Sequence, residues 1–264
     1  MQVKPLEPFG VEAAGVNVTA ASEGELHEFR KLACRHGVLV IRDQQIDDSQ
    51  FQRFLSEFGP LTFTKGMAAV PDYPGLNLVS NVGRKKKPRS VFHTDTSYVR
   101  CPPSFTALRA VTIPEGGGET LFTDQYLAYE RLSDEIRERF ATATVLHQAT
   151  GVTLDSDDES ESWHPLFRRH PDTGRTTLFL STPERCIAIK GSAYPSDESS
   201  AENWIEQFFE HSIEETHLLR HHWKDGDLVV WDNRCTLHRA DHSQVRGNRV
   251  LHRAIVEGEE PIMA

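Results

Sequence analysis

The amino-acid sequence predicts a mainly β protein with flanking helices, built as a sandwich or a barrel. Short β-rich runs recur along the chain and are separated by turn residues, which is typical of such sheets. Helical patterns are few and unevenly spaced, so the strand–helix alternation of a doubly wound parallel sheet is missing. Neither a GxGxxG nor a GxxxxGKS/T stretch occurs, which argues against the common nucleotide-binding folds.

The expected elements follow from the spacing of apolar residues along the chain. Apolar positions three and four apart predict helices over residues 23–36, 48–58, 125–140 and 198–214. Runs rich in β-branched and aromatic residues predict strands over residues 38–42, 76–80, 105–111, 119–123, 176–180, 186–190, 227–232 and 249–257. No repeat or long linker interrupts this pattern, so residues 1–264 are expected to form a single domain.

Composition excludes several classes of protein. The 264 residues carry a formal net charge of −10, and their mean hydropathy is −0.48. No apolar run approaches the roughly 20 residues that span a bilayer, and the acidic balance argues against nucleic-acid binding. The four cysteines (Cys34, Cys101, Cys186 and Cys235) form no CxxC pair. Separated thiols, and an N-terminus without a basic and then apolar leader, predict a cytoplasmic protein.

Two His-x-Asp stretches are candidates for a metal site. Residues 170–172 (HPD) lie in RRHPDTGRT, where proline, aspartate and glycine predict a turn, so we interpret them as structural. His93 and Asp95 lie instead between β-favouring flanks, in SVFHTDTSY. Residues two apart in a strand point to the same side, so this imidazole and this carboxylate can bind one ion. A third ligand would complete the 2-His-1-carboxylate arrangement of non-haem Fe(II) enzymes.

The C-terminal stretch WDNRCTLHRADHSQVRGNRVLHRAIVEG (231–258) supplies further candidates. It reads as strand, turn, strand, with His238 near the end of the first strand. Arg249 and Arg253 then share one face of the second strand, whose residues alternate between two buried faces. Buried guanidinium groups are costly unless anions neutralise them. They either clamp the carboxylates of a small acid or pair with Asp and Glu side chains within the fold.

Four stretches, in order, resemble conserved blocks of the taurine dioxygenase (TauD/TfdA) family of Fe(II)- and 2-oxoglutarate-dependent dioxygenases. They are HGVLVIRDQQIDDSQFQRFLSEFGPL (36–61), FHTDTSYVRCPPSFTALRAVTIPEGGGETLFTD (92–124), HPLFRRHPDTGRTTLFL (164–180) and WDNRCTLHRA (231–240). The resemblance covers most of the chain. It implies a double-stranded β-helix (jelly-roll) core with flanking helices, and the cofactors Fe2+, 2-oxoglutarate and O2.

Carried over position by position, the resemblance implies roles for single residues. His93, Asp95 and His238 correspond to the iron ligands, and the presence of Asp95 favours hydroxylation over halogenation. Arg249 corresponds to the arginine that binds the distal carboxylate of 2-oxoglutarate, and Thr120 to the threonine that assists it. Arg253 corresponds to the position that commonly meets the acidic group of the primary substrate.

The substrate is expected to be small and anionic, although the contacts specific for taurine are not evident. Arg89 stands where a taurine enzyme carries an asparagine, and Pro183 where it carries an aromatic residue. Arg89 follows the basic run 84–87, which is either a solvated loop or a rim that attracts an anionic substrate. Segments 62–90 and 151–163 are expected to be lids over the site.

The expected reaction is the oxidation of a C–H bond of this substrate, most simply its hydroxylation, with release of succinate and CO2. Desaturation or carbon–heteroatom cleavage by the same machinery, in a biosynthetic pathway, is the alternative outcome. A zinc hydrolase with the same ligands would leave Arg249 and Thr120 without a role, and the intact ligand set argues against a non-catalytic binding protein. The family resemblance also suggests a homodimer or homotetramer, and no nucleic acid or membrane is expected as a partner.

Overall fold

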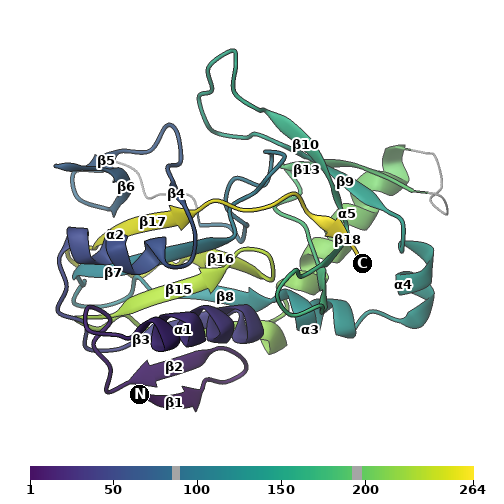
Figure 1. Cartoon of the computed structure of the whole chain (residues 1–264). Helices are drawn as coiled ribbons and strands as arrows, with labels where there is room; N and C mark the ends of the chain where they lie inside the picture. Colours follow the sequence, from purple (N-terminus) through teal and green to yellow (C-terminus); the bar gives the residue numbers. More distant parts are fainter. Residues whose placement is uncertain (85–89, 192–197) are drawn as a thin grey trace.

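The structure, a computed structural model, describes residues 1–84, 90–191 and 198–264. Its centre is a sandwich of two mainly antiparallel sheets, one large and one with three strands (Figure 1). Two helices cover the outer face of the large sheet, and two smaller sheets with further helices lie on the side away from the N-terminal hairpin. This is the mainly β fold with flanking helices that the sequence predicts.

The large sheet contains nine strands among the described residues. They are β1 (Gln2–Pro5), β2 (Val11–Ala14), β3 (Val38–Ile41), β4 (Leu61–Thr62), β5 (Ala69–Val70), β6 (Tyr73–Ser80), β7 (Phe105–Thr112), β15 (Leu228–Asp232) and β17 (Val250–Val256). Their order is β1-β2-β3-β15-β7-β17-β6-β5, and β4 pairs with β17. Neighbours run antiparallel except β2 and β3. The central strands are therefore β15, β7 and β17, which are distant in sequence.

The small sheet faces the inner side of the large one. It consists of β8 (Thr120–Asp124), β14 (Leu218–His221) and β16 (Thr236–Ala240), with β8 in the middle. Apolar side chains from both sheets form one buried cluster, in which Phe122 of β8 meets Trp231 of β15 and Leu251 of β17. Because side chains alternate along a strand, Leu228 and Val230 of β15 point the other way and pack under the helices.

Helices α1 (Glu23–His36) and α2 (Asp48–Ser56) cover that outer face (Figure 1). Each begins with a capping box, formed by Ser22 with Glu25 in α1 and by Asp47 with Gln50 in α2. Phe29 of α1 is fully buried in the cluster beneath the helices. Burial of such a side chain stabilises the fold by about 1.5–3 kcal/mol, so packing rather than helix propensity holds the two helices in place.

The remaining elements build the part of the molecule farthest from β1 and β2 (Figure 1). One sheet contains β9 (Thr144–Gln148), β10 (Glu161–Pro165) and β13 (Cys186–Lys190), and another contains β11 (Phe167–Arg169), β12 (Thr176–Leu178) and β18 (Ile262–Met263). The helices are α3 (Gln125–Glu130), α4 (Asp134–Arg139), α5 (Glu198–Ser212) and the 3-10 turn η1 (Glu215–His217).

Two sequence predictions are wrong in detail. The helix expected over 125–140 is two short helices, because the hydroxyl of Ser133 accepts the backbone N–H of Ile136 and starts a new helix. His238 does not end the strand that contains Trp231 but lies in a strand of its own, β16, in the opposite sheet. The predicted strand ranges also omit β1, β2, β4, β5, β9, β10, β11, β14 and β18. None of the helices in the described ranges is both long and apolar enough to cross a membrane.

Candidate functional site

His93 and His238 are joined by an isolated β-bridge between their backbones. Each amide N–H donates to the carbonyl oxygen of the other residue, at 3.0 and 2.9 Å. His238 belongs to β16, where it pairs with Phe122 of β8. The bridge thus fastens the His93–Asp95 segment to the small sheet, and the two imidazole rings lie 4.4 Å apart between centroids.

Asp95 brings a carboxylate to the same point. Its Oδ1 lies 3.9 Å from Nε2 of His93 and 3.8 Å from Nε2 of His238. Nδ1 of His93 bonds the carbonyl oxygen of Val91, so Nε2 is the nitrogen left for a ligand. Two atoms that bind one ion at about 2.1 Å can lie up to about 4.2 Å apart, so these distances fit a shared metal ion.

The protonation states also suit a metal. Burial lowers the pKa of His238 to about 3, and the nearby His93 acts in the same direction. Burial likewise lowers the pKa of His93. Burial alone would raise the pKa of Asp95, but the charge of Arg253, the two imidazoles and a hydrogen bond from Thr106 hold it well below its usual range. Two neutral imidazoles and a carboxylate are the forms that bind a divalent cation.

Arg249 lies beside Thr120 in the interior of the sandwich. Its Nε donates to the carbonyl oxygen of Gly118 at 2.9 Å, and its Nη2 donates to Oγ1 of Thr120 at 3.2 Å. Gly118 has a φ of +82°, and a Cβ there would lie 3.0 Å from Cδ of Arg249. Glycine is therefore needed at this turn both for its backbone conformation and for the close approach of the arginine.

The guanidinium of Arg249 is almost fully buried, at 2% exposure. Burial lowers its pKa to about 10, so it keeps its charge at neutral pH. Within the described ranges, no ion pair joins it to a carboxylate. A buried and unneutralised arginine costs free energy, which a bound anion would offset.

Thr120 is oriented by a residue that the sequence reasoning missed. Nε1 of Trp223 donates to Oγ1 of Thr120 at 3.1 Å, on the oxygen that also accepts from Arg249. A hydroxyl oxygen has two lone pairs, and both are now used. The single hydroxyl hydrogen of Thr120 is therefore free to donate to an anion held by Arg249. Trp223 follows β14 in a polar stretch, HHWKDG, without a pattern that signals a site.

Arg253 reaches the metal-site carboxylate. Its Nη1 lies 3.4 Å from Oδ1 of Asp95, and its Nη2 lies 3.3 Å from Oδ1 of Asn77. Its Nε has no hydrogen-bond partner within the described parts of the chain. The sequence left two alternatives for the buried arginines, a pair with an acid of the fold or a bound ligand, and the two arginines differ in this respect. Arg253 has an internal acid, and Arg249 has none among the described residues.

The second His-x-Asp stretch has separate partners for its two side chains. Nε2 of His170 donates to Asp232 at 2.9 Å, while Nδ1 of His170 accepts the backbone N–H of Asp172. Asp172 pairs with Arg30 and Arg234. His170, Asp232 and Cys34 lie within ligand distance of one another. However, Arg234 binds Asp232 at 2.6 Å and supplies the positive charge there. The structural interpretation of this stretch agrees with these contacts.

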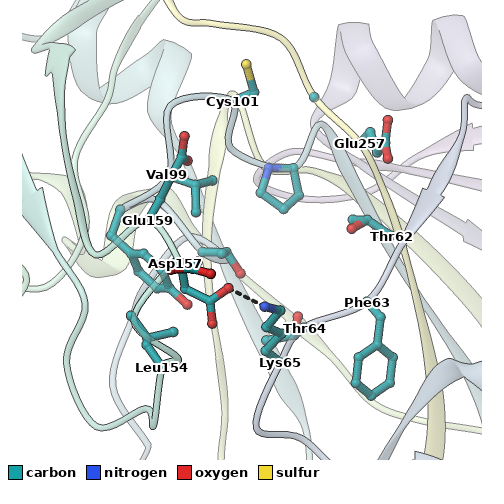
Figure 2. Close-up of a pocket in the computed structure, with 15 residues that line it drawn as sticks. Thr62, Phe63, Thr64, Lys65, Val99, Cys101, Leu154, Asp157, Glu159 and Glu257 are labelled. Carbon is teal, nitrogen blue, oxygen red and sulfur yellow. Dashed lines mark hydrogen bonds and ion pairs between the residues drawn. The ribbon is translucent and has the colours of Figure 1, made fainter.

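A cavity of about 450 Å³ lies beside the segment that follows Asp95 in the sequence, and Figure 2 shows the residues that line it. Thr96, the residue after Asp95, lines it, together with Thr64 and Gly258. The carbonyl oxygen of Thr64 accepts from Nδ2 of Asn77, whose Oδ1 faces Arg253. Lys65 and Asp158 form an ion pair across the cavity, drawn as a dashed line in Figure 2. Further acids at the rim are Asp157, Glu159 and Glu257.

The structure thus brings together six of the seven residues singled out from the sequence, in two groups. His93, Asp95, His238 and Arg253 form one, and Thr120 and Arg249 form the other. Register links them: Thr120 and Phe122 point to the same side of β8, and Phe122 pairs with His238. Two residues along a strand span roughly 7 Å. Arg89, the remaining candidate, lies outside the described residues.

Comparisons with known proteins show which family and which solved structures this chain resembles. The model of the family "Taurine catabolism dioxygenase TauD, TfdA family" matches residues 2–255. The 2,4-dichlorophenoxyacetate dioxygenase of Cupriavidus pinatubonensis is 29% identical over 95% of this chain and 94% of its own. The crystal structure of a taurine dioxygenase from Burkholderia xenovorans superposes with a TM-score of 0.85 at 31% identity, over 99% of this chain and 92% of that one. A structure of AAD-2 in complex with Mn(II) and N-oxalylglycine gives a TM-score of 0.83 at 28% identity, over 98% of both chains.

Proposed function

The chain belongs to the taurine catabolism dioxygenase (TauD, TfdA) family, and from that premise we propose that it hydroxylates a C–H bond of a small anionic substrate. Membership makes it a 2-oxoglutarate-dependent dioxygenase with a jelly-roll core that uses Fe2+, 2-oxoglutarate and O2. The fine assignments below, of residues and of substrate, are our proposal. Residues 1–264 would form one such domain.

We assign the metal to His93, Asp95 and His238. The support is their geometry: three ligand atoms from two chain segments converge, with both imidazoles held neutral and the carboxylate held ionised. Three protein ligands leave the other positions of an octahedral ion open for co-substrates. When bound there, Fe2+ supplies the redox chemistry of the reaction. The protein supplies the positions and charges around it.

We assign the distal carboxylate of 2-oxoglutarate to Arg249 and Thr120. The observation that carries this assignment is the buried guanidinium that lacks a carboxylate partner among the described residues. The arginine would neutralise the carboxylate, and the hydroxyl of Thr120 would donate a further hydrogen bond. Thr120 lies roughly 7 Å along β8 from Phe122, the residue that pairs with His238, and a five-carbon dicarboxylic acid can span a distance of this order.

We assign the acid group of the primary substrate to Arg253 and the rest of the substrate to the adjoining cavity. A volume of about 450 Å³ lies within the usual range for small-molecule sites. The rim carries Asp157, Glu159 and Glu257, so a second anionic group at that end would be repelled. The preferred substrate is therefore a monoanion, such as a carboxylate, sulfonate or sulfate ester, with a neutral or cationic far end.

Within the predicted lid segments 62–90 and 151–163, β5 and β6 belong to the large sheet, and residues 85–89 lie outside the described residues. We propose residues 63–68 and 151–160 as the lids. Support comes from the cavity, because Lys65 belongs to the first segment and Asp158 to the second, and the two pair across it. A cytoplasmic location and a dimeric or tetrameric assembly also stand as proposals. Desaturation or carbon–heteroatom cleavage stays the alternative outcome, since the same oxidation step precedes each of them.

The experiment is a turnover assay with a panel of small acids. The protein is loaded anaerobically with Fe2+ and 2-oxoglutarate, then exposed to O2 with each acid, and succinate and oxidised product are measured. We expect succinate only when both cofactors are present, and the highest yields with monoanions. Asp95→Ala should abolish the formation of succinate and of oxidised product. Asp172→Ala, in the other His-x-Asp stretch, should change only the stability of the protein. Turnover that needs neither O2 nor 2-oxoglutarate would point to a zinc hydrolase instead.

A further inference from the structure

Three buried residues lead from the core of the sandwich to Asp95. We propose that Trp231, Asn233 and Thr106 form a positioning chain that occupies one oxygen of the Asp95 carboxylate and presents the other to the metal. The inference rests on the proposed metal site, and it assigns roles to three residues outside the ligand set. Trp231 and Asn233 lie two residues apart, at the end of β15 and in the turn after it, whereas Thr106 comes from β7, which is distant in sequence.

The contacts are continuous and short. Nε1 of Trp231 donates to Oδ1 of Asn233 at 3.0 Å. Nδ2 of Asn233 donates to Oγ1 of Thr106 at 2.8 Å. Oγ1 of Thr106 then donates to Oδ2 of Asp95 at 2.8 Å. Exposure is at most 2% for the three members of the chain and 5% for Asp95, so water does not compete for these groups.

The direction of every hydrogen bond follows from chemistry. An indole N–H can only donate, so the atom of Asn233 that faces it must be the amide oxygen. The amide nitrogen therefore faces Thr106 and donates to its hydroxyl oxygen. The only hydrogen of that hydroxyl is left for the carboxylate, which accepts it at Oδ2. A chain with a single possible polarity holds the carboxylate in one orientation.

The middle member of the chain, Asn233, and its first member, Trp231, are themselves fixed. The carbonyl oxygen of Asn233 accepts from Oγ1 of Thr94, which lies between the two proposed ligands of the motif. The backbone N–H of Asn233 donates to the carbonyl oxygen of Ser104. The indole of Trp231 also packs against the imidazole of His238, with 4.6 Å between ring centroids. One tryptophan therefore contacts one proposed ligand directly and orients another through Asn233 and Thr106.

The consequence for the metal is a carboxylate that binds through one oxygen. With Oδ2 engaged by Thr106, Oδ1 is the atom that faces both imidazoles. If Oδ2 were free, the carboxylate could turn and bind through both oxygens. One-oxygen binding keeps a coordination position open for a co-substrate. Partners that orient metal ligands in this way typically change metal affinity by 10–100-fold when removed.

The test measures binding of Co2+ to the purified full-length chain, with its visible absorption spectrum as a second readout. Thr106→Val removes the hydroxyl and keeps the shape of the side chain, and we expect a 10–100-fold loss of Co2+ affinity with an altered spectrum. Thr106→Ser keeps the hydroxyl and should stay within about threefold of the wild-type affinity, well below the loss expected for Thr106→Val. The matched control is Ser212→Ala, which removes an equally buried hydroxyl that donates to the carbonyl oxygen of Phe208 within α5.

The outcomes separate this inference from the proposed function. If the wild-type chain binds no divalent metal, or binds it equally well in Asp95→Ala, the metal site itself is wrong. If the wild type binds Co2+ and Thr106→Val binds it with the same affinity and spectrum, the positioning chain alone is wrong. The same conclusion follows if Ser212→Ala loses as much affinity as Thr106→Val.

A second variant covers the case in which Thr106→Val does not fold. Asn233→Asp keeps the shape of the amide but replaces its donor by an acceptor. The hydroxyl of Thr106 would then be drawn toward position 233 and away from Asp95. We expect at least a tenfold loss of Co2+ affinity from this variant, and an unchanged affinity overturns the proposal.

Discussion

Arg253 is ion-paired to Asp95, with 3.4 Å between Nη1 and Oδ1. The pair joins the residue proposed to hold the substrate to a residue proposed to hold the metal. The same oxygen of Asp95 faces both imidazoles. The positive charge of Arg253 therefore lies next to the expected position of the metal cation. Loss of this charge should affect substrate binding and metal binding in opposite directions.

Replacing Arg253 with methionine should weaken substrate binding and tighten metal binding. Loss of a charge-assisted clamp on an acid costs about 1.5–3 kcal/mol, or roughly 10–150-fold in KM for the acid. Removal of the neighbouring cation should at the same time lower the Kd for Mn2+. The KM for the acid and the Kd for Mn2+ can be measured on one preparation. Arg109→Met, on the helix-facing side of β7, is the control for the loss of a half-buried arginine. A parallel loss of both affinities would contradict the proposed arrangement.

Replacing Arg249 with methionine should abolish binding of 2-oxoglutarate while leaving the empty protein as stable as before, or more stable. The buried charge has no carboxylate partner among the described residues, so its removal takes away a cost. Thermal melting of the metal-loaded protein checks this. A ligand at 100 times its Kd stabilises the wild type by about 2.7 kcal/mol, and the variant should show no such shift. A variant that 2-oxoglutarate stabilises as strongly as the wild type would place the co-substrate elsewhere.

His164 should make the fold less stable in mild acid. Its Nε2 donates to the carbonyl oxygens of Ser97 and Val99, at 2.9 and 3.0 Å, and so anchors the loop that follows Asp95. Burial lowers the pKa of His164 to about 4. The unfolded chain takes up this proton near pH 6.5 and the folded chain only near pH 4. The contribution of His164 to the free energy of unfolding is therefore constant above pH 6.5. It falls between pH 6.5 and pH 4, by up to roughly 3 kcal/mol.

His164→Gln isolates that contribution, because glutamine keeps a donor but does not titrate. Urea unfolding at pH 7.5 and pH 5 should show a smaller loss for the variant than for the wild type. His147, whose pKa is also lowered by burial, adds its own loss in acid to both proteins. Arg168 and Glu260 influence His164 with opposite signs. Equal losses in the two proteins would show that His164 is not kept neutral by the fold.

Thr96 should be replaceable by asparagine with a gain in stability. Its φ is +43°, a conformation that β-branched residues rarely adopt, and such strain costs of order 1–3 kcal/mol. Asparagine tolerates this region, so Thr96→Asn should raise the urea midpoint. Thr112→Asn, at an exposed position of β7, is the control and should not raise it. Because Thr96 lines the cavity, the variant should also change KM among the acids tested.

The sandwich could be predicted from the sequence because some strands of its large sheet are continuously apolar. VLVI and LVVW are buried on both faces, and burial of this kind leaves a continuous apolar run. Strands of two or three residues, such as β4 and β18, leave no periodic trace. The helix expected over 125–140 is broken because Ser133 fits both a polar helix surface and an N-cap, and a local pattern cannot distinguish the two.

The residues proposed to bind the metal and the co-substrate could be predicted from the sequence. The residues that orient their side chains could not. His93 and Asp95 share a motif, and Arg249 and Arg253 stand out as charges on a buried strand. Trp223, Thr106 and Asn233 are ordinary residue types whose role depends on which strand lies opposite. That information is set by the pairing of β7, β15 and β17, which only the tertiary structure contains.

The backbone bridge between His93 and His238 has a consequence for the order of folding. Its two halves come from distant parts of the chain, since His93 precedes β7 and His238 lies in β16. Contacts of such long sequence separation form late, after the entropy of a long loop has been lost. A divalent cation added during refolding should therefore leave the folding rate unchanged and slow unfolding instead. The ion would stabilise the folded sandwich after it has formed and would not help to nucleate its folding.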